Sequence, residues 1–500
     1  MGLVEAVAGI LFDASVLLPY QEGSSLQPSA QSLLRRLRHS GIRSGIFCGE
    51  GLPDDEVGFL KSMAMQYSFN HFLVGASSSA IDEVNAAWND IGGTILCVIS
   101  NNKKDDFTQL ATSGWLFLIL DVEGAVSCPN SNRFHINKLE ELPLAISNLN
   151  KKAIGSDVVT VAYIMKTSRE EDFAKRGAFP IQHTPNGLIF LPITFDLPLS
   201  SQLREADVIL HKATDEILSI DLSNSSESPN RIIYTRGMQE LQSYMNHHPE
   251  CIAIDPLNNI YPVLDRLKIQ RLLLGLEDLN SEGHCAIRGP HFLKIDDFNA
   301  PGLVQRLAES KLSLPSIVKP RVACGVADAH SMAVIFRNED FKDLNVPCPA
   351  VVQEYVDHSS TLFKFYVLGE KVFYAVKKST PNANTLMKLS HRKGPGPLHF
   401  DSLKSLPTSA EHAGNGSNDK SLDLKLVTDA AIWLAKMLDL TIFGFDVVIQ
   451  EGTGDHVIVD VNYLPSFKEV PDDIAIPAFW DAIKKKFESK RSKQCAVSNC

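Results

Sequence analysis

Two aspartates and one asparagine near the C-terminal end of the chain are the residues best suited to do chemistry. Asp446 lies in one run rich in Val, Ile and Phe, Asp460 and Asn462 lie in the next, and the glycines between the runs predict a β-hairpin. Folded about Thr453, this hairpin places Asp446 opposite Asp460. Asp460 and Asn462 then share one face, roughly 7 Å apart, because side chains alternate along a strand.

Two carboxylates and a carboxamide that meet at one spot are hard oxygen ligands. Mg²⁺ suits them, because it takes few protein ligands and fills its other positions with water and phosphate. The alternative is a hairpin with a solvated acidic face. The position of Asp460 deep in an apolar strand favours the metal site.

Basic residues on earlier strands could neutralise phosphate. Lys319 stands among apolar residues in the strand-like run 316–321, and a loop of small residues, 322–330, follows it. Small side chains let backbone N–H groups approach phosphate oxygens closely. His330 closes this loop, and an ordinary loop histidine is the alternative. Lys364 alternates with two phenylalanines in a later strand, and a surface lysine is the alternative there.

A third motif is suited to holding a nucleotide base. The run 350–356 passes from an apolar strand into Gln353, Glu354 and Tyr355. Backbone amide and carbonyl groups at such an exit can hold the edge of an adenine.

The composition restricts the class of protein. A chain of 500 residues predicts about three domains, and 44% hydrophobic residues are enough for sizeable cores. The net charge of −11 argues against a nucleic-acid partner, so an anionic substrate must be met by local basic groups. Nine scattered cysteines without a CxxC pair predict a reducing compartment. The sequence has no stretch of about 18 apolar residues, so we expect no membrane span, and we expect no signal peptide.

The elements that must position these residues begin with an α/β domain over residues 1–150. Apolar runs at 7–12, 45–48, 94–99 and 115–120 alternate with helical segments and predict a parallel, Rossmann-like sheet. The order resembles the haloacid-dehalogenase-like hydrolases, whose first strand ends in a nucleophilic Asp followed two residues later by a second Asp.

Here Asp13 keeps the first carboxylate of that motif, while Ser15 replaces the second. Asp105 and Asp106 are the candidates for the acidic pair that holds Mg²⁺ in those hydrolases. One carboxylate can attack a phosphoryl group, but the missing acid has no obvious substitute. The sequence therefore predicts a catalytically silent domain.

The rest of the chain divides into further parts. Polar residues over 140–157 predict a linker, and a second small α/β lobe is expected over 156–250. A third domain over 251–482 contains a predicted helix at 260–279 and all the motifs described so far. The basic tail 483–500 is predicted to be disordered.

The order of the motifs resembles that of the ATP-grasp enzymes. The sequences of the individual motifs are most similar to those of the inositol trisphosphate 5/6-kinases, also called inositol-tetrakisphosphate 1-kinases. The resemblance covers about 156 to 480, and the N-terminal domain is similar to the silent hydrolase-like extension of the plant members. The matching stretches are 318–325, 329–332, 352–358, 362–369, 379–382 and 459–465.

This resemblance implies an ATP-grasp kinase that phosphorylates a hydroxyl of an inositol tris- or tetrakisphosphate with ATP and two Mg²⁺ ions, in inositol phosphate metabolism and phytate biosynthesis. Phosphoryl transfer needs positioning and charge neutralisation rather than a protein nucleophile. No catalytic side chain is therefore expected beyond the electrostatic roles of Lys319, His330 and Lys364. The implied contacts are Arg266, Lys319, Gln353, Glu354, Tyr355, Lys364 and Ser379 for ATP, Arg169, Lys212, His330, Lys364 and Asn462 for the inositol phosphate, and Asp446, Asp460 and Asn462 for the metal ions.

Several positions depart from the family pattern. Glu170 and Glu171 stand where the family has a cluster of lysines, and the other departures are Ala329, Lys377 and Ser466. These departures affect substrate positions rather than nucleotide positions, so the inositol phosphate isomer stays open. Two alternatives also stay open: a carboxylate–amine ligase that forms an acyl-phosphate, and a non-catalytic inositol phosphate sensor or scaffold. We expect a monomer in the cytoplasm, with the nucleus as a second location.

Overall fold

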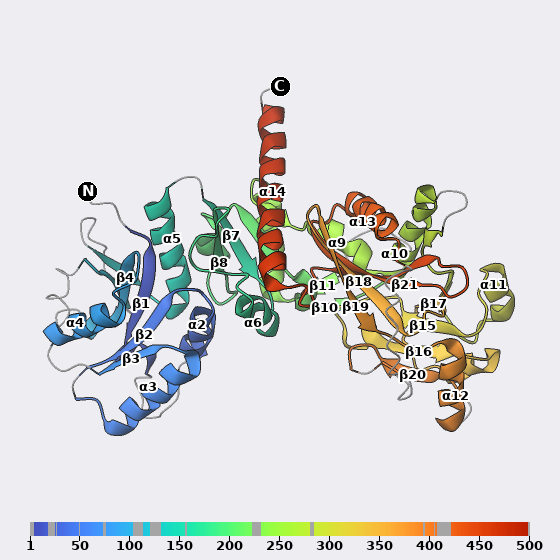
Figure 1. Cartoon of the computed structure of the whole chain (residues 1–500), viewed down its shortest axis with the longest axis horizontal. Coiled ribbons are helices and arrows are strands. Elements are labelled where there is room, and N and C mark those ends of the chain that lie inside the picture. The colour runs from blue at the N-terminus through green and yellow to red at the C-terminus, as the bar shows by residue number, and fades with distance from the viewer. Residues whose placement is uncertain are drawn as a thin grey trace. The chain divides into compact units, whose positions relative to one another are not determined.

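The computed structural model divides into two compact units, which are described separately (Figure 1). The first unit comprises Met1–Leu210 with Asn246–Ile252, and the second comprises His211–Met245 with Ala253–Cys500. The structure describes residues 5–18, 26, 28–49, 51–73, 77–103, 114–120, 132–155, 158–222, 232–280, 285–393, 396–404, 406–407 and 422–498. Asp105 and Asp106, the candidate acidic pair, lie outside the described residues.

The first unit begins with a six-stranded parallel sheet in the order β3-β2-β1-β4-β5-β6. Its central strand β1 is buried along its whole length, as its apolar sequence predicts. We call this sheet with helices α1–α5 the parallel-sheet domain. Its strands are β1 (Val7–Asp13), β2 (Arg43–Cys48), β3 (Asn70–Leu73), β4 (Thr94–Ser100), β5 (Leu116–Leu120) and β6 (Arg133–Ile136), and its helices are α1 (Ala14–Leu17), α2 (Pro28–Arg38), α3 (Asp54–Tyr67), α4 (Ser77–Ala87) and α5 (Leu142–Ile154).

Helices cover both faces of this sheet. Leu34 of α2, Leu60 of α3 and Ile146 of α5 belong to one apolar core. Val84 of α4 and the neighbouring Trp88 belong to a second core on the other face. The parallel sheet between two helical layers confirms the fold class predicted for this part of the chain.

Helix α5 occupies most of the segment that the sequence predicted to be a linker. Asn150, inside this helix, is fully buried, and its carboxamide oxygen accepts a hydrogen bond of 2.8 Å from the backbone N–H of Val7 in β1. Its amide nitrogen lies 3.4 Å from the carbonyl oxygen of Ile181. Asn150 therefore belongs to the core of the unit, and the parallel-sheet domain ends only after Ile154.

The first unit also contains β7, β8 and most of β9, which belong to a four-stranded sheet in the order β12-β9-β7-β8. The predicted lobe over 156–250 is thus divided, because the contacts place residues 211–245, including the hairpin β10 (Ile217–Ile220) and β11 (Ile232–Tyr234), in the second unit. The other elements of this region are β7 (Val159–Ile164), β8 (Leu188–Pro192), β9 (Val208–His211), β12 (Ile252–Ile254), α6 (Thr167–Lys175), α7 (Leu199–Leu203) and α8 (Arg236–His247).

The second unit contains two five-stranded sheets, in the orders β14-β17-β15-β16-β20 and β13-β22-β21-β18-β19. Neighbouring strands are antiparallel, except that β13 runs parallel to β22. The first sheet comprises β14 (Phe292–Ile295), β15 (Ser316–Pro320), β16 (Ser331–Ile335), β17 (Ala350–Glu354) and β20 (Leu398–Asp401). The second comprises β13 (Ile287–Arg288), β18 (Thr361–Leu368), β19 (Lys371–Lys378), β21 (Ile442–Ile449) and β22 (His456–Tyr463).

The helix predicted over 260–279 is broken in the structure. The break lies at Asp265, whose carboxylate accepts a hydrogen bond of 2.9 Å from the N–H of Leu267 and caps a new helix. The helices of this unit are α9 (Leu257–Leu264), α10 (Arg266–Leu273), α11 (Leu303–Glu309), α12 (Ala383–Lys393), α13 (Leu424–Leu438) and α14 (Asp472–Ser498).

Helix α14 differs from the disordered tail that the basic composition of 483–500 predicted. It continues through the lysine-rich stretch to Ser498 (Figure 1). Its first half is anchored by the buried side chains of Ala475, Phe479 and Ile483. Along the part of the chain that the structure describes, no helix combines the length and the apolar character needed to cross a bilayer.

We expect Asn150→Ala to lower the free energy of unfolding by about 1–3 kcal/mol, because it leaves the buried N–H of Val7 without its acceptor. Urea unfolding of the full chain measures this loss. Lys152→Ala, an exposed change in the same helix, is the control. Equal stabilities of the two variants would show that Asn150 has no role in the core.

Candidate functional site

Three neighbouring strands of the second unit carry a row of charged side chains. In the ladder, Lys364 on β18 pairs with Asp446 on β21, and Asp446 pairs in turn with Asp460 on β22. Paired residues point to the same face, and neighbouring strands lie about 4.7–4.9 Å apart. Asn462 joins this row, since its Nδ2 donates to Asp460 Oδ2 at 3.2 Å. The structure therefore brings these four residues together, with Asp446 opposite Asp460 as the sequence predicted.

Aromatic side chains occupy the opposite face of the same strands. The rings of Phe365 and Phe445 stack with centroids 5.1 Å apart, and Phe443 lies 6.3 Å from Phe445. All three are fully buried. Gly444 is required between them, because a Cβ there would come within 2.9 Å of the Phe365 carbonyl oxygen. This apolar layer fixes the face on which the charged row must lie.

A β-bulge in the hairpin sets the pairing of the two aspartates. Next to the turn, Val447 pairs with Ile458, but one step further Asp446 pairs with Asp460, so Val459 is an extra residue on β22. With a regular ladder Asp446 would face Val459, and Asp460 would point to the aromatic face. The pairing that the sequence predicted is correct, but it depends on this bulge rather than on a turn centred on Thr453.

Burial dominates the electrostatics of Asp446. Desolvation raises its pKa to about 6, the nearby Lys364 ammonium opposes this rise, and the negative charge of Asp460 adds to it. One carboxylate oxygen, Oδ1, is buried and has no hydrogen-bond partner among the described residues. Such an oxygen beside a second carboxylate is suited to a cation.

The donor set fits Mg²⁺ better than a transition metal. Among the described residues no group of three or more His, Cys, Asp or Glu side chains could hold a metal ion. The site offers two carboxylates and one carboxamide, all oxygen donors, and Mg²⁺ accepts such a partial shell when water and phosphate supply the rest. The residues Asp446, Asp460 and Asn462 are therefore those that would hold it.

Lys319 reaches the acidic hairpin from the other sheet of the unit. Its Nζ donates to the carbonyl oxygen of Val459, the bulge residue, at 3.3 Å. Burial lowers the pKa of Lys319 to about 8, although the negative charge of Asp460 favours its protonated form. The lysine that the sequence placed on a strand before a small-residue loop thus lies beside the two aspartates.

Arg266, predicted to contact ATP phosphates, instead donates hydrogen bonds to backbone carbonyl oxygens of the small-residue loop and of the strand before it. Its Nη1 donates to the carbonyl oxygens of Pro320, Val322 and Ala329 at 2.7, 2.8 and 3.1 Å, and its Nη2 lies 3.3 Å from that of Ala323. Its Nε is buried without a partner among the described residues. In this arrangement the guanidinium holds the loop, and Nε remains for a further acceptor.

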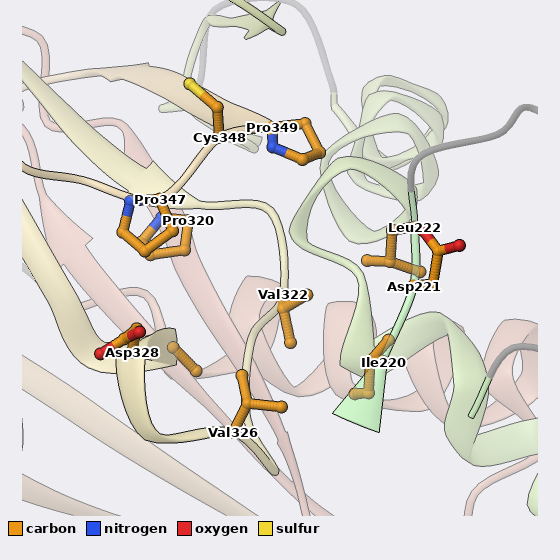
Figure 2. A pocket seen from close by; sticks show the side chains of 11 residues that line it. Ile220, Asp221, Leu222, Pro320, Val322, Val326, Asp328, Pro347, Cys348 and Pro349 are labelled. Carbon is orange, nitrogen blue, oxygen red and sulfur yellow. The ribbon is translucent and has the colours of Figure 1, made fainter. Parts of the chain in front are cut away.

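The small-residue loop also packs against hairpin β10–β11. Gly325 has φ of +88°, and a Cβ there would lie 2.8 Å from Ile217 of β10. A pocket of about 330 Å³ lies on this side of the loop, and Figure 2 shows Ile220 and Leu222 on one side of it and Val322 and Val326 on the other. Its lining is apolar apart from carboxylates such as Asp328, which does not suit a polyanion.

His330 ends the loop, as the sequence predicted. Its Nδ1 lies 3.2 Å from Ser402 Oγ, and the side chain is half-buried. Burial and the neighbouring Arg266 lower its pKa, while Asp460 opposes the shift. A neutral imidazole at this place can still donate one N–H to a phosphate oxygen.

The polar residues at the end of β17 have different roles: one lines the site, and another is bound by neighbouring residues of the fold. Gln353 is buried, its Nε2 has no partner among the described residues, and it shares a small cavity with Arg266 and Asp460. The Glu354 carboxylate is instead held by Arg288 through two hydrogen bonds of 2.8 and 3.0 Å. Its backbone N–H donates to the carbonyl oxygen of His291, within the sheet.

Tyr355 and Ser379, also predicted to contact the nucleotide, make local contacts. The Tyr355 hydroxyl donates to the carbonyl oxygen of Pro381 at 2.6 Å. Ser379 Oγ lies 2.9 Å from Nε2 of His358. These contacts tie the segment after β19 to the exit of β17, so the two residues shape this wall of the site.

Two predicted substrate contacts lie on different units. Lys212 belongs to the second unit, where its Nζ donates to the carbonyl oxygen of Tyr463 at the end of β22 and lies 4.9 Å from the centre of that ring. The Tyr463 hydroxyl accepts a hydrogen bond of 2.9 Å from the N–H of Asp255, which fixes the strand end. Arg169 is half-buried on α6 of the first unit.

The sequence analysis missed Glu469 and treated Lys377 only as a departure from the family. Glu469, in the loop after β22, accepts hydrogen bonds from Lys377 and from the Tyr366 hydroxyl. Burial alone would raise its pKa, but these two donors lower it to about 2. The alternation of β19 could have placed Lys377 on the face of Lys364, whereas nothing in the loop sequence indicates Glu469.

Comparisons with known proteins decide the family. The family described as "ITPK4, N-terminal HAD-like domain" matches residues 1–152, and "Inositol 1,3,4-trisphosphate 5/6-kinase ATP-grasp domain" matches residues 281–480. Inositol-tetrakisphosphate 1-kinase 6 of Oryza sativa subsp. japonica is 48% identical over 97% of this chain and 89% of its own length. The chain belongs to the inositol-tetrakisphosphate 1-kinase family.

More distant relatives agree with this family. Inositol-tetrakisphosphate 1-kinase of Danio rerio is 31% identical over 57% of this chain and 69% of its own length. Among solved structures, the match with D-alanine–D-alanine ligase of Bacillus anthracis covers 67% of this chain and 99% of that chain, with 12% identity and a TM-score of 0.40. The family models thus confirm the predicted fold class, an ATP-grasp domain preceded by a haloacid-dehalogenase-like domain.

We expect Glu469→Gln to lower the melting temperature at pH 7 by about 2–4 °C, the shift that about 1 kcal/mol causes in a domain of roughly 200 residues. The folded pKa of Glu469, about 2, lies below its ordinary value of 4.5. Its stabilisation is therefore present above pH 4.5 and is lost as the pH falls from 4.5 toward 2.

Thermal melts of both proteins between pH 7 and pH 3 measure this difference, which should shrink below pH 4.5. Glu370→Gln, which removes an exposed ion pair with Lys485, is the matched control and should change little. A difference that stays constant across this range would contradict the assigned pKa.

Proposed function

We propose that this chain is an ATP-dependent kinase that phosphorylates a hydroxyl of a soluble inositol tris- or tetrakisphosphate. The observation that carries the proposal is the row of Lys364, Asp446 and Asp460, met by Lys319 from the other five-stranded sheet of the unit. In a member of this family, that row supplies the charges that phosphoryl transfer needs.

Each residue of the row has a separate role in this mechanism. Asp446, Asp460 and Asn462 would hold two Mg²⁺ ions, which neutralise charge on the phosphates of ATP. Lys319 and Lys364 bind phosphate oxygens, and a bound phosphate favours the protonated form of Lys319, whose pKa burial lowers to about 8. No side chain attacks the phosphorus atom; the nucleophile is a substrate hydroxyl.

The inositol phosphate carries several dianionic groups, so separate basic donors must hold it. In the second unit these are Lys212, His330 and Lys364, with Asn462 as a polar contact. Lys212 donates to the carbonyl oxygen of Tyr463, which holds its ammonium at the end of β22. Arg169 of the first unit is the further candidate that the family resemblance implies.

The parallel-sheet domain has no catalytic role in this proposal. Asp13 is fully buried, and one of its carboxylate oxygens accepts hydrogen bonds from the N–H and the hydroxyl of Ser15. Ser15 Oγ also lies 3.1 Å from Ser100 Oγ. A serine in place of the second aspartate cannot act as the general acid at neutral pH, which supports a silent domain.

The proposal includes a setting for the enzyme. We place it in the cytoplasm and the nucleus, as a monomer without nucleic-acid or membrane partners. The net charge of −11 is unsuited to nucleic acid, and free thiols such as Cys97 and Cys348 suit a reducing compartment. A role in phytate biosynthesis follows from a substrate of this class.

The direct test is to incubate the full chain with ATP, Mg²⁺ and a panel of inositol tris- and tetrakisphosphates, and to identify the products by chromatography. A new phosphate on the inositol ring supports the kinase. ADP release that needs a carboxylate and an amine would instead show the ligase, and tight binding without turnover would show the sensor.

We expect Asp460→Asn to reduce kcat to less than about a tenth while the melting temperature stays near that of the wild type, because the change is isosteric and removes one metal-binding charge. Steady-state kinetics at several Mg²⁺ concentrations measure this. Asp13→Asn is the matched control and should keep full kinase activity. If Asp460→Asn stays active, the metal assignment is wrong, and a phosphatase activity abolished by Asp13→Asn would end the silent-domain proposal.

We expect His330→Ala to raise KM for the inositol phosphate about ten- to hundredfold and to leave KM for ATP unchanged. The reason is the loss of one hydrogen bond to a charged phosphate, which costs about 1.5–3 kcal/mol. His399→Ala, an exposed histidine on β20, is the control. An equal rise in both KM values, or no rise, would show that His330 does not bind the inositol phosphate and is an ordinary loop residue.

A further inference from the structure

Within the first unit, an ion pair joins helix α2 of the parallel-sheet domain to helix α6 of the following lobe. Arg36 Nε donates to Glu170 Oε1 at 2.7 Å, and Arg36 Nη2 lies 3.3 Å from Oε2. The two side chains are only 23% and 11% exposed. A bidentate pair so far from solvent is weakly screened and holds a defined geometry, unlike an ordinary surface pair.

Glu170 is also bound to the interior of its own lobe. The Tyr163 hydroxyl donates to Glu170 Oε1 at 3.2 Å. The Tyr163 ring stacks on Phe179 with centroids 4.1 Å apart and meets Phe190 edge-on at 6.3 Å. The carboxylate therefore has partners on both sides of the boundary between the domain and the lobe.

A second contact lies beside this pair. The N–H of Ile181 donates to the carbonyl oxygen of Ser40 at 3.1 Å, and the Ile181 side chain packs into the core of the parallel-sheet domain. The cavity lined by Arg36 and Tyr163 measures about 30 Å³, which is room for only about two water molecules. The boundary is thus closely packed and is not a ligand site.

These contacts account for the acidic residues that interrupt the family's basic cluster. Glu170 is bound by Arg36, and Glu171 forms an ion pair of 2.9 Å with Lys175 one helical turn later. Both carboxylates therefore have cations within the first unit. Neither needs a role in binding the anionic substrate, and Glu170 has a docking role instead.

The docking also fixes the orientation of α6. The N–H groups of Arg169 and Glu170 both donate to the carbonyl oxygen of Lys166 at 3.0 Å, so the two residues follow each other in the first turn. A helix turns by about 100° per residue, so holding the Glu170 side chain in one direction sets the direction of Arg169.

We propose that the Arg36–Glu170 pair is a positioning contact for the kinase reaction, through which the parallel-sheet domain fixes helix α6 and the substrate-binding Arg169. The inference rests on the proposed function. It gives the silent domain a purpose: it is a structural part of the lobe that carries Arg169.

The test compares Arg36→Met, which keeps the length of the side chain, with the exchanged pair Arg36→Glu with Glu170→Arg. We expect Arg36→Met to raise KM for the inositol phosphate about three- to tenfold, the range for losing a contact worth about 1 kcal/mol, with KM for ATP unchanged. Amide hydrogen exchange of α6 should become faster in the same variant. The exchanged pair should restore both properties at least in part.

Arg43→Met is the matched control, because it removes a bidentate pair with Asp90 that is exposed and lies away from the docking contact. An unchanged inositol phosphate KM in a folded Arg36→Met protein would overturn the proposal. An equal effect on ATP, or the same effect in Arg43→Met, would overturn it as well. A failure of the proposed function is distinguishable, because the wild type would then transfer no phosphate to any inositol phosphate.

Discussion

The repulsion between two partly buried carboxylates on neighbouring strands is the constraint on which the second unit depends. Asp446 and Asp460 lie side by side with an aromatic layer behind them, so neither can move away from the other or through the sheet. Burial and this repulsion raise the pKa of Asp446 to about 6. The arrangement is stable as a dianion only when positive charge is brought close to it.

The surrounding structure supplies that charge from several elements. Lys364 stands next to Asp446 in the same sheet, and Lys319 arrives from the other sheet to bind the carbonyl oxygen of the bulge residue. Arg266 carries its charge near Asp460 but directs its Nη donors to loop carbonyls. The small-residue loop and the acidic hairpin are thus held in place before any ligand binds. This lowers the free-energy cost of ordering them on binding.

In our proposals, the parallel-sheet domain of the first unit has a structural role and no catalytic one. The parallel sheet retains Asp13 at the end of its central strand, but a serine follows where an acid would be needed. Meanwhile Asn150 and Arg36 bind groups on other elements of the unit through buried or half-buried contacts. These contacts hold the domain against its neighbouring elements in a defined geometry.

The sequence by itself determined the local elements and the types of residue at the site. Alternating apolar residues indicated β18, β19, β21 and β22, and the order of the motifs identified the ATP-grasp family. These features depend on side chains close together in the chain, whose spacing follows directly from the period of a strand or helix.

Tertiary structure alone decided the features that depend on distant partners. The bulge at Val459 aligns the two aspartates, and its carbonyl is bound by a lysine 140 residues earlier. The break at Asp265 exists because that carboxylate caps α10 and pairs with Arg321, and the polar segment around Asn150 is helical because its carboxamide meets β1. From the sequence alone, a polar side chain is predicted to lie on the surface. Only the folded chain shows whether it has a buried hydrogen-bond partner.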